Sequence, residues 1–354
     1  MTGAGLGAKA RPFPDFPDQD MPQTPTDVLV LGNAIVDVIA RTDDDFLLAQ
    51  DLRKGAMQLI DEARAEALYA AMGPATVVSG GSGANTAVGV AALGGRAAFV
   101  GKVRDDELGR LFAHDLRAIG VGFDVAPAPD GAATARSFIL VTPDGERTMN
   151  TYLGACQALG PEDVDPAAVQ AARIVYLEGY LWDPPAAKEA FRKAVGLAHE
   201  AGNAVALTLS DAFCVDRYRD EFLGLMRDGS LDIVFANIHE LKSLYQTADE
   251  AAALAALRDE TDVLGVVTRS SEGAMVVTRG ETRSVPAQRV EQVVDTTGAG
   301  DLFAAGFLAG LTRGLDHADC ARLGGIAAAE VITHIGARPQ ASLRDLARQE
   351  GLLD

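Results

Sequence analysis

The stretch that decides the fold class is Val294-Asp295-Thr296-Thr297-Gly298-Ala299-Gly300-Asp301, which continues into Leu302-Phe303-Ala304-Ala305-Gly306-Phe307. Apolar Val293 and Val294 predict an extended approach, and the glycines predict a tight turn. Apolar residues then recur at helical spacing, at Leu302, Phe303, Phe307 and Leu311. A strand, a glycine turn and a helix in this order predict an anion site, because the first backbone N–H groups of a helix are free to donate. We expect Gly298, Ala299 and Gly300 to supply these donors.

Asp301 lies in the first turn of that helix, beside the expected anion. A carboxylate repels an anion, so its position needs a reason. It could accept a proton from a hydroxyl while the amides hold the group being attacked. It could also simply stabilise the helix dipole, which contributes roughly 0.3–1 kcal/mol. In either case we expect the helix N-terminus to lower the pKa of Asp301.

A second glycine turn, Ser79-Gly80-Gly81-Ser82-Gly83-Ala84-Asn85, follows apolar Val77 and Val78 and precedes a helical run over 87–93. One interpretation is a dinucleotide fingerprint, because Gly81-Ser82-Gly83 begins G-x-G and Asp105 follows. Thr86 replaces the third glycine, which argues against this interpretation. The other is a cradle for a small polyhydroxylated ligand, with Gly80 and Gly81 allowing close approach and the Asn85 amide donating and accepting.

Three further polar side chains follow apolar runs. Asp37 comes shortly after the run 28–31, and Asn237 and Glu240 follow the run 233–235. Ligands of open α/β sheets bind beyond the carboxyl ends of the strands, so each could contact a ligand. Asp37 could equally form a turn. Asn237 and Glu240 could order phosphate-bound Mg²⁺ through water, or cap a helix.

Buried strands are predicted over 28–31, 97–100, 174–177, 204–209, 233–235 and 263–267, with helical patterns between them. This alternation predicts a doubly wound, mostly parallel sheet flanked by helices, in one α/β domain over 25–354. The turn Pro143-Asp144-Gly145-Glu146 predicts a β-hairpin within 133–154. We expect it to form a small β-sheet lid with part of 41–60. Arg147, on this hairpin, could reach a phosphate or lie in solvent. Tyr180 follows a strand and could stack on a base or pack in the core.

Composition excludes several classes of protein. The net charge of −19 argues against nonspecific binding to nucleic acid or to anionic membranes. No apolar run approaches the roughly 18 residues of a membrane span. Cys156, Cys214 and Cys320 are far apart, and neither they nor the histidines show metal-ligand spacing, so we expect reduced core cysteines in a cytoplasmic protein. Residues 1–24 are expected to be a flexible extension and not a secretory signal, and Met21 is an alternative start to Met1.

From residue 27 to residue 341 the chain resembles the ribokinase-like (PfkB-type) family of sugar and nucleoside kinases. The 79–85 turn looks like the first family signature, the stretch 295–301 looks like the second, and Asn237-x-x-Glu240 lies between them. Three stretches look closer to adenosine kinases: Gly32-Asn33-Ala34-Ile35-Val36-Asp37, Gly179-Tyr180 and Leu207-Thr208-Leu209-Ser210-Asp211-Ala212-Phe213.

The resemblance implies ATP-dependent phosphorylation of a primary hydroxyl, with Asp301 as base and Gly298, Ala299 and Gly300 as anion hole. It implies a substrate site made by Asn33, Asp37, Gly80, Gly81, Ser82, Asn85, Arg147 and Tyr180. It implies an ATP site made by Asn237, Glu240, Thr268, Gly273, Thr297, Gly298 and Gly300, with Glu240 organising Mg²⁺ through water. A monovalent cation such as K⁺ is a further candidate cofactor, and a monomer or a homodimer is expected.

Two residues depart from the family pattern. Ser270 occupies a position that is often Gly, and Ser82 replaces the lysine of ribokinases proper, which argues against ribose. A nucleoside, first of all adenosine giving AMP, is therefore the expected acceptor. A sugar of the ribose, fructose or ketogluconate type is the alternative. A dinucleotide oxidoreductase and a catalytically silent binding protein of the same fold are the other classes, although a silent protein would be expected to lack Asp301.

Overall fold

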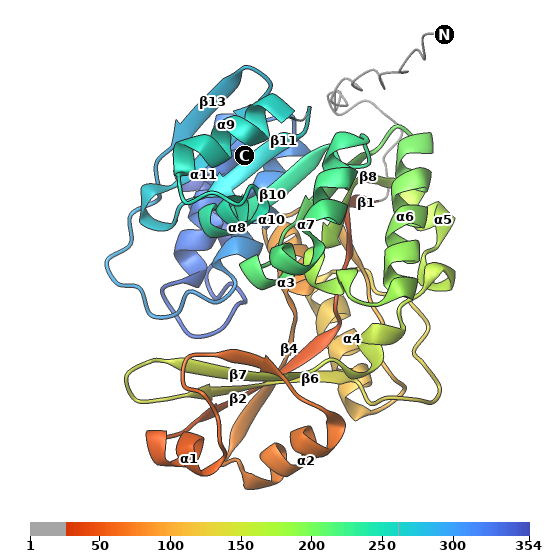
Figure 1. Cartoon of the computed structure of the whole chain (residues 1–354), viewed down its shortest axis with the longest axis vertical. Coiled ribbons are helices and arrows are strands. Elements are labelled where there is room, and N and C mark those ends of the chain that lie inside the picture. Colours follow the sequence, from red (N-terminus) through yellow and green to blue (C-terminus); the bar gives the residue numbers. More distant parts are fainter. Residues whose placement is uncertain (1–25, 261) are drawn as a thin grey trace.

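The computed structural model describes residues 26–260 and 262–354, so the expected extension over 1–24 and the choice between Met1 and Met21 lie outside the described residues. A large sheet of eight strands has the order β13-β12-β11-β10-β9-β8-β1-β5 (Figure 1). The six strands from β11 to β5 run parallel, and β12 and β13 extend the sheet as an antiparallel edge. Its strands are β1 (Thr26–Leu31), β5 (Ala97–Val100), β8 (Ala172–Glu178), β9 (Ala204–Thr208), β10 (Ile233–Asn237), β11 (Leu264–Thr268), β12 (Ala274–Thr278) and β13 (Glu281–Val285). The predicted doubly wound, mostly parallel sheet is confirmed.

Helices cover both faces of this sheet. They are α3 (Ser82–Ala92), α4 (Glu107–Ile119), α5 (Pro166–Gln170), α6 (Pro185–Glu200), α7 (Ala212–Arg227), α8 (Ile238–Leu244), α9 (Glu250–Glu260), α10 (Ala299–Leu311), α11 (His317–Val331) and α12 (Leu343–Gln349). Short 3₁₀ helices are η1 (Gly154–Ala158), η2 (Pro161–Asp163), η3 (Gly179–Trp182) and η4 (Ser270–Glu272).

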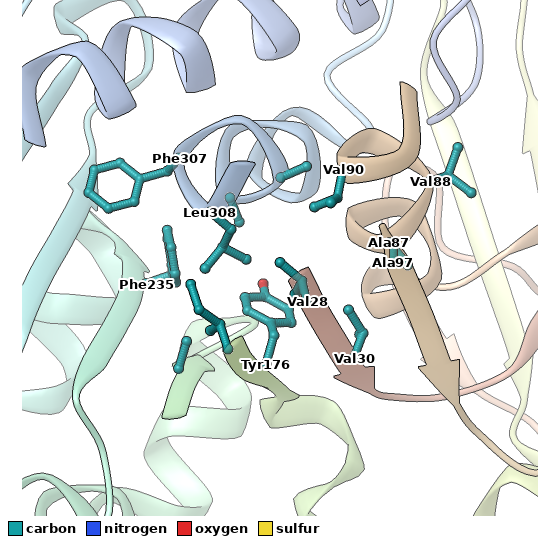
Figure 2. Close-up of a cluster of buried hydrophobic side chains, with 14 of the residues drawn as sticks. Val28, Val30, Ala87, Val88, Val90, Ala97, Tyr176, Phe235, Phe307 and Leu308 are labelled. Atoms are coloured by element: carbon teal, nitrogen blue, oxygen red, sulfur yellow. The ribbon is translucent and has the colours of Figure 1, made fainter. Parts of the chain in front are cut away.

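Each central strand is buried on both faces, because its alternate side chains enter two different cores. Val28, Val30 and Tyr176 pack with residues of α3, α4, α10 and α11, whereas Leu29 and Leu31 pack with residues of α6 to α9. Figure 2 shows part of the first core, where Tyr176 and the two valines on the strands face the helices that carry Leu308 and Ala87. The two cores fix the carboxyl ends of the strands and the first turns of α3 and α10 relative to one another.

A second sheet of five strands has the order β3-β7-β6-β2-β4 and lies beside the large sheet (Figure 1). Its strands are β2 (Ile35–Arg41), β3 (Met57–Leu59), β4 (Ala75–Gly80), β6 (Ala135–Val141) and β7 (Arg147–Tyr152). The predicted hairpin within 133–154 is β6 and β7, and β3 comes from 41–60. The sequence did not indicate that β2 and β4 also belong to this sheet.

One face of this second sheet, the lid sheet from here on, is covered by helices α1 (Asp44–Ala49) and α2 (Glu62–Ala71). The side chains buried under them are Val38, Ala40, Leu47, Leu52, Ala65, Leu68, Phe138, Leu140 and Tyr152. Because side chains alternate along a strand, the intervening residues point to the opposite face. That face is turned toward the large sheet.

The prediction of a strand directly before Asp295 is wrong. The last strand, β13, ends at Val285, and residues 286–298 form no helix or strand. Val293 and Val294 are 52% and 43% exposed, and Val294 N–H donates to the Ile332 carbonyl. The apolar pair therefore belongs to a loop held by the residue after α11, and not to the sheet. No helix within the described ranges is long and apolar enough to cross a membrane.

Candidate active site

A cavity of about 840 Å³ lies between the carboxyl edge of the large sheet and the uncovered face of the lid sheet. Its wall includes Asn33, the second residue after β1. It also includes the last residues of β8, β9, β10 and β11, which are Glu178, Thr208, Asn237 and Thr268. The lid sheet contributes Asp37, Met57, Leu59, Ile139 and Met149. Ligands of open α/β sheets bind at this edge, so the cavity is the candidate active site.

Asp301 lines the cavity from the first turn of α10. Its carboxylate accepts hydrogen bonds from the Ser82 hydroxyl at 2.6 Å and from the Asn85 side-chain amide at 2.9 Å. Burial raises the pKa of Asp301, and these hydrogen bonds and the charge of Arg338 oppose the rise. The expectation of a lowered pKa is therefore wrong, because desolvation by burial outweighs the hydrogen bonds and the charge that lower it. A raised pKa makes Asp301 a better proton acceptor.

The start of α10 is shaped for an anion. Gly298 is the N-cap at φ +77°, and no side chain caps the helix. A Cβ on Gly298 would lie 2.6 Å from the Ala337 Cβ, so this turn needs glycine. Gly298 and Gly300 line the cavity beside Asp301. The glycine turn that the sequence predicted for the helix start is present, although the preceding segment is a loop. Ala299 differs from the expectation, because its N–H donates to the Thr296 carbonyl at 3.2 Å and the residue does not line the cavity.

The 79–85 turn differs from its expected role as an open backbone cradle. Glu178, only 1% exposed, accepts from Gly83 N–H at 2.8 Å, from Asn33 N–H at 3.2 Å and from the Asn33 side-chain amide at 2.9 Å. A Cβ on Gly83 would lie 2.8 Å from the Glu178 carboxylate. A dinucleotide pyrophosphate at this helix start would meet a protein carboxylate. The dinucleotide interpretation is therefore wrong.

Asp37 lies within β2 and not just past a buried strand, because the chain leaves the large sheet after Leu31 and enters the lid sheet at Ile35. Its carboxylate lies against Gly80, where a Cβ would come within 2.2 Å of an Asp37 oxygen. Gly81 has φ +89° and packs against the Asn33 carbonyl. Burial raises the pKa of Asp37 to about 6, opposed by the charges of Arg338 and Arg147.

Asn237 and Glu240 form a reciprocal helix cap at the start of α8. The Asn237 side-chain oxygen accepts from Glu240 N–H at 2.9 Å, and Glu240 accepts from Asn237 N–H at 2.9 Å. The helix-capping interpretation is thus present in the structure, and both residues also line the cavity. Burial raises the pKa of Glu240 to about 7. No cluster of three or more His, Cys, Asp or Glu side chains suited to a metal occurs among the described residues. This donor set fits an ion held mainly by phosphates and water.

Of the other predicted ATP residues, Thr268 and Thr297 line the cavity and Gly273 does not. Gly273 has φ +88° and its carbonyl accepts from Arg269 N–H at 2.7 Å, so it closes the turn around η4. Ser270 has φ +51°, a conformation that glycine adopts at lower cost, which explains why its position suits glycine.

Arg147 does not line the cavity. Its guanidinium pairs with Asp295 and also donates to the Thr297 hydroxyl at 2.5 Å, which links β7 of the lid sheet to the 295–301 stretch. Asp295 also accepts from Gly336 N–H at 2.8 Å. Tyr180 lines the cavity, and its hydroxyl donates to the Ser210 carbonyl at 3.2 Å.

The sequence did not single out Glu178, Phe213 or Arg338 as site residues. Glu178 ends a buried strand directly before Gly179-Tyr180. A carboxylate at the end of a buried strand could have indicated a site residue. Phe213 is 62% exposed on the cavity wall. Arg338 reaches the 79–85 turn from more than 250 residues away, and no local pattern predicts such a contact.

Comparison with known proteins agrees with this geometry. A curated relative from Halopiger xanaduensis, described as an ATP-dependent ribose-1-phosphate kinase, is 34% identical over 65% of this chain and 72% of its own. A solved structure of adenosine kinase from Sinorhizobium meliloti is 57% identical, covers 92% of this chain and 99% of its own, and has a TM-score of 0.87. A probable sugar kinase from Rhizobium etli is 54% identical, covers 93% and 99%, and has a TM-score of 0.88.

The three cysteines are buried and free, and none of them lines the cavity. The family model for pfkB family carbohydrate kinases matches residues 25–343. With Asp301 at the start of α10 and the cavity in front of it, the chain belongs to the pfkB carbohydrate kinase family, and is a phosphotransferase with an alcohol group as acceptor.

Proposed function

We propose that this enzyme transfers the γ-phosphoryl group of ATP to the primary hydroxyl of a nucleoside, with adenosine giving AMP as the first choice. The observation that carries this proposal is the apolar part of the cavity. Met57, Leu59 and Phe213 are 42%, 51% and 62% exposed, and all three line it. Exposed apolar side chains that converge on one cavity indicate an apolar ligand surface. A flat purine base fits them, whereas a free sugar offers only hydroxyls.

The charges of the wall support an acceptor without a phosphate. Six carboxylic residues line the cavity: Asp37, Glu178, Asp183, Asp211, Glu240 and Asp301. The one arginine in the wall among the described residues, Arg217, is already paired with Asp183 at 2.8 Å. A sugar phosphate would bring a further dianion to these carboxylates. Activity on ribose 1-phosphate, as in the name of the Halopiger relative, is therefore not expected here.

The reaction follows from the positions of the polar groups. Asp37 and Asn33 bind acceptor hydroxyls, and Asp301 accepts the proton of the primary hydroxyl as its oxygen bonds to the γ-phosphorus. The bond from the γ-phosphorus to the bridging oxygen breaks, ADP leaves, and the N–H groups at the start of α10 stabilise the transferred group. Asn237 and Glu240 would hold Mg²⁺ through water, and the ion would neutralise part of the charge on the phosphates.

A sugar kinase is the second candidate, because the Rhizobium etli structure at 54% identity is described as a probable sugar kinase. The polar end of the cavity, with Asp37 and Asn85, would serve a sugar equally well. The two candidates differ in whether the apolar residues matter for the acceptor.

ADP release over a panel of nucleosides and free sugars tests the proposal, with ribose 1-phosphate included and Asp301→Asn as the blank. We expect kcat/KM for adenosine to exceed that for any free sugar by on the order of 100-fold. Leu59→Ser and Phe213→Ala should raise the KM for adenosine, while Leu48→Ser, on the exposed surface of the lid helix α1, should not. Preference for fructose, ribose or ketogluconate, with no effect of these variants, would establish the sugar kinase instead.

A further inference from the structure

Arg338, in the segment after α11, makes an unusual connection. Its guanidinium donates to the carbonyls of Ser79 and Ala84, both at 3.1 Å, and to the Ser79 hydroxyl at 3.3 Å. Ser79 lies near the end of β4 in the lid sheet, and Ala84 lies in the first turn of α3. One planar side chain therefore binds the two ends of the 79–85 turn and ties a lid strand to a helix of the large domain.

The segment that carries Arg338 is itself fixed on both sides. Before it, Gly336 N–H donates to Asp295 at 2.8 Å. After it, Gln340 and Ala341 donate their N–H groups to the Glu330 carboxylate at 2.8 and 2.7 Å. These bonds fix the position of Arg338 relative to the 295–301 stretch. Arg338 then fixes the position of the 79–85 turn.

The charge of Arg338 faces three carboxylates. It acts on Asp37 from β2, on Asp301 from α10 and on Asp115 from α4. Asp115 also accepts from Ser79 N–H at 3.3 Å, so the Ser79 peptide is held from both sides. Arg147 is the other cation acting on Asp37, and Glu178 is a further carboxylate near Asp301. Two acceptor-site carboxylates that face each other repel, and a nearby cation offsets that repulsion.

We propose that Arg338 is a positioning residue for phosphoryl transfer: it sets the 79–85 turn between Asp37 and Asp301, and its positive charge offsets these two carboxylates. It touches neither acceptor nor phosphate and acts through the groups that do. The inference uses the phosphotransferase reaction and rests on the proposed nucleoside acceptor only for the choice of substrate in the kinetic test.

The test compares Arg338→Met, which keeps the length and loses the charge, with Arg338→Lys, which keeps the charge and loses the planar fork. The control is Arg313→Met. Arg313 also bridges two carbonyls, of Leu93 at 2.9 Å and Ala309 at 2.7 Å, but neither belongs to the cavity wall. Carboxyl titration by NMR of protein labelled at its aspartates, with Asp37 assigned through Asp37→Asn, needs no acceptor.

The Asp37 carboxyl should titrate at a higher pH in Arg338→Met and at the wild-type pH in Arg338→Lys and Arg313→Met. With adenosine as acceptor, Arg338→Met should lose about 10-fold in kcat/KM because its catalytic groups are misplaced. The acid limb of its pH profile of kcat/KM should also move to higher pH. Arg338→Lys should raise KM and leave that limb unchanged. Unchanged Asp37 titration in Arg338→Met overturns the proposal. Should Arg338→Met not fold, a wild-type KM in Arg338→Lys overturns it. A wild-type enzyme inactive on nucleosides refutes the proposed acceptor and leaves the titration as the test.

Discussion

Helices α3 and α10 begin in the same way and are used differently. Each follows a glycine with positive φ, Gly81 at +89° and Gly298 at +77°, and neither glycine provides a capping side chain. In α3, the Gly83 N–H is taken by Glu178 from β8. In α10, Asp301 turns its carboxylate to Ser82 and Asn85, and no side chain caps the helix. One helix start binds the protein's own carboxylate, and the other is the one that we propose holds the phosphoryl group.

This difference shows that a glycine turn before a helix indicates an anion but not whose anion it is. Glu178 is 95 residues from Gly83, so no local pattern could assign it. Glu178 at the filled helix start fixes the side chain of Asn33, which we propose binds the acceptor. In the proposed reaction, the open helix start of α10 holds the group that is transferred.

The largest effect on activity is expected from a substitution at Asp301, in the first turn of the open helix start. Asp301→Asn keeps the shape of the side chain and removes its ability to take a proton, so kcat should fall by about 10²–10⁴-fold. The KM of the acceptor should change little. Asp316→Asn is the matched control, because Asp316 caps the start of α11 outside the cavity wall. Steady-state kinetics with both substrates decide it, and an unchanged kcat in Asp301→Asn would remove Asp301 as the base.

A pair of glycine substitutions separates the two helix starts directly. A Cβ on Gly300 meets no atom within 4 Å, whereas a Cβ on Gly83 lies 2.8 Å from Glu178 and 3.0 Å from Val30. Gly300→Ala should therefore leave stability unchanged or raise it by about 0.5–1 kcal/mol. Gly83→Ala should lower stability by about 1–3 kcal/mol.

The activity of the folded protein should respond in the opposite order, with a larger loss in Gly300→Ala than in Gly83→Ala. In Gly300→Ala the new methyl group enters the cavity where the phosphoryl group would lie, so turnover should fall by about 10-fold or more. Urea denaturation and kinetics on the same samples check both statements. Equal losses of stability in the two variants would contradict the distinction between a filled and an open helix start.

Removing the internal carboxylate tests the filled helix start. Glu178→Ala leaves Gly83 N–H and Asn33 N–H without their acceptor, at a cost of about 1–3 kcal/mol for each donor. Glu178→Gln should cost less, because one amide oxygen can keep both backbone bonds while the Asn33 amide rotates. Both variants should raise the KM of the acceptor, since Asn33 loses its fixed orientation. A thermal melt of each, against Glu189→Gln on the exposed face of α6, measures the difference, and an unchanged KM would show that Asn33 does not bind the acceptor.

Local pattern was sufficient for much of the fold. The buried runs at 174–177 and 233–235 became strands because apolar residues on both faces can only be satisfied between two helix layers. The hairpin around Gly145 followed from its turn residues. Asp301 was predicted as the base because a carboxylate beside an expected anion site calls for a chemical reason, and the structure shows that it lines the cavity.

Contacts over long sequence separations explain what the sequence missed. Val293 and Val294 have the composition of a strand but find no strand partner, since β13 already ends the sheet at Val285. The run 27–40 reads as one strand and a turn, yet the chain changes sheets between Leu31 and Ile35. Arg338 acts on a turn more than 250 residues away. Such choices depend on which partner a segment meets in three dimensions.

The smallest effect is a pH dependence of stability, to which Glu178 at the filled helix start contributes. Burial raises the folded-state pKa of Glu178 and Glu240 from 4.5 to about 7 and that of Asp37 from 3.8 to about 6. Between these values the folded protein binds more protons than the unfolded chain, so stability should fall as pH rises from about 4.5 to about 7. Asp295, whose pKa is lowered, acts in the opposite sense but below pH 3.8.

Glu178→Gln removes one of these titrating groups. The fall of stability with rising pH should then be shallower by up to about 1.4 kcal/mol per pH unit. Urea midpoints at pH 5, 6 and 7 measure the slope, with the exposed Glu189→Gln as the variant that keeps it. A slope equal to wild type in Glu178→Gln would mean that Glu178 stays ionised throughout, held by its three donors. The filled helix start would then hold a permanent negative charge, and the cavity would have to tolerate Asp37, Asp301 and Glu178 charged together, with the charge of Arg338 acting on the first two.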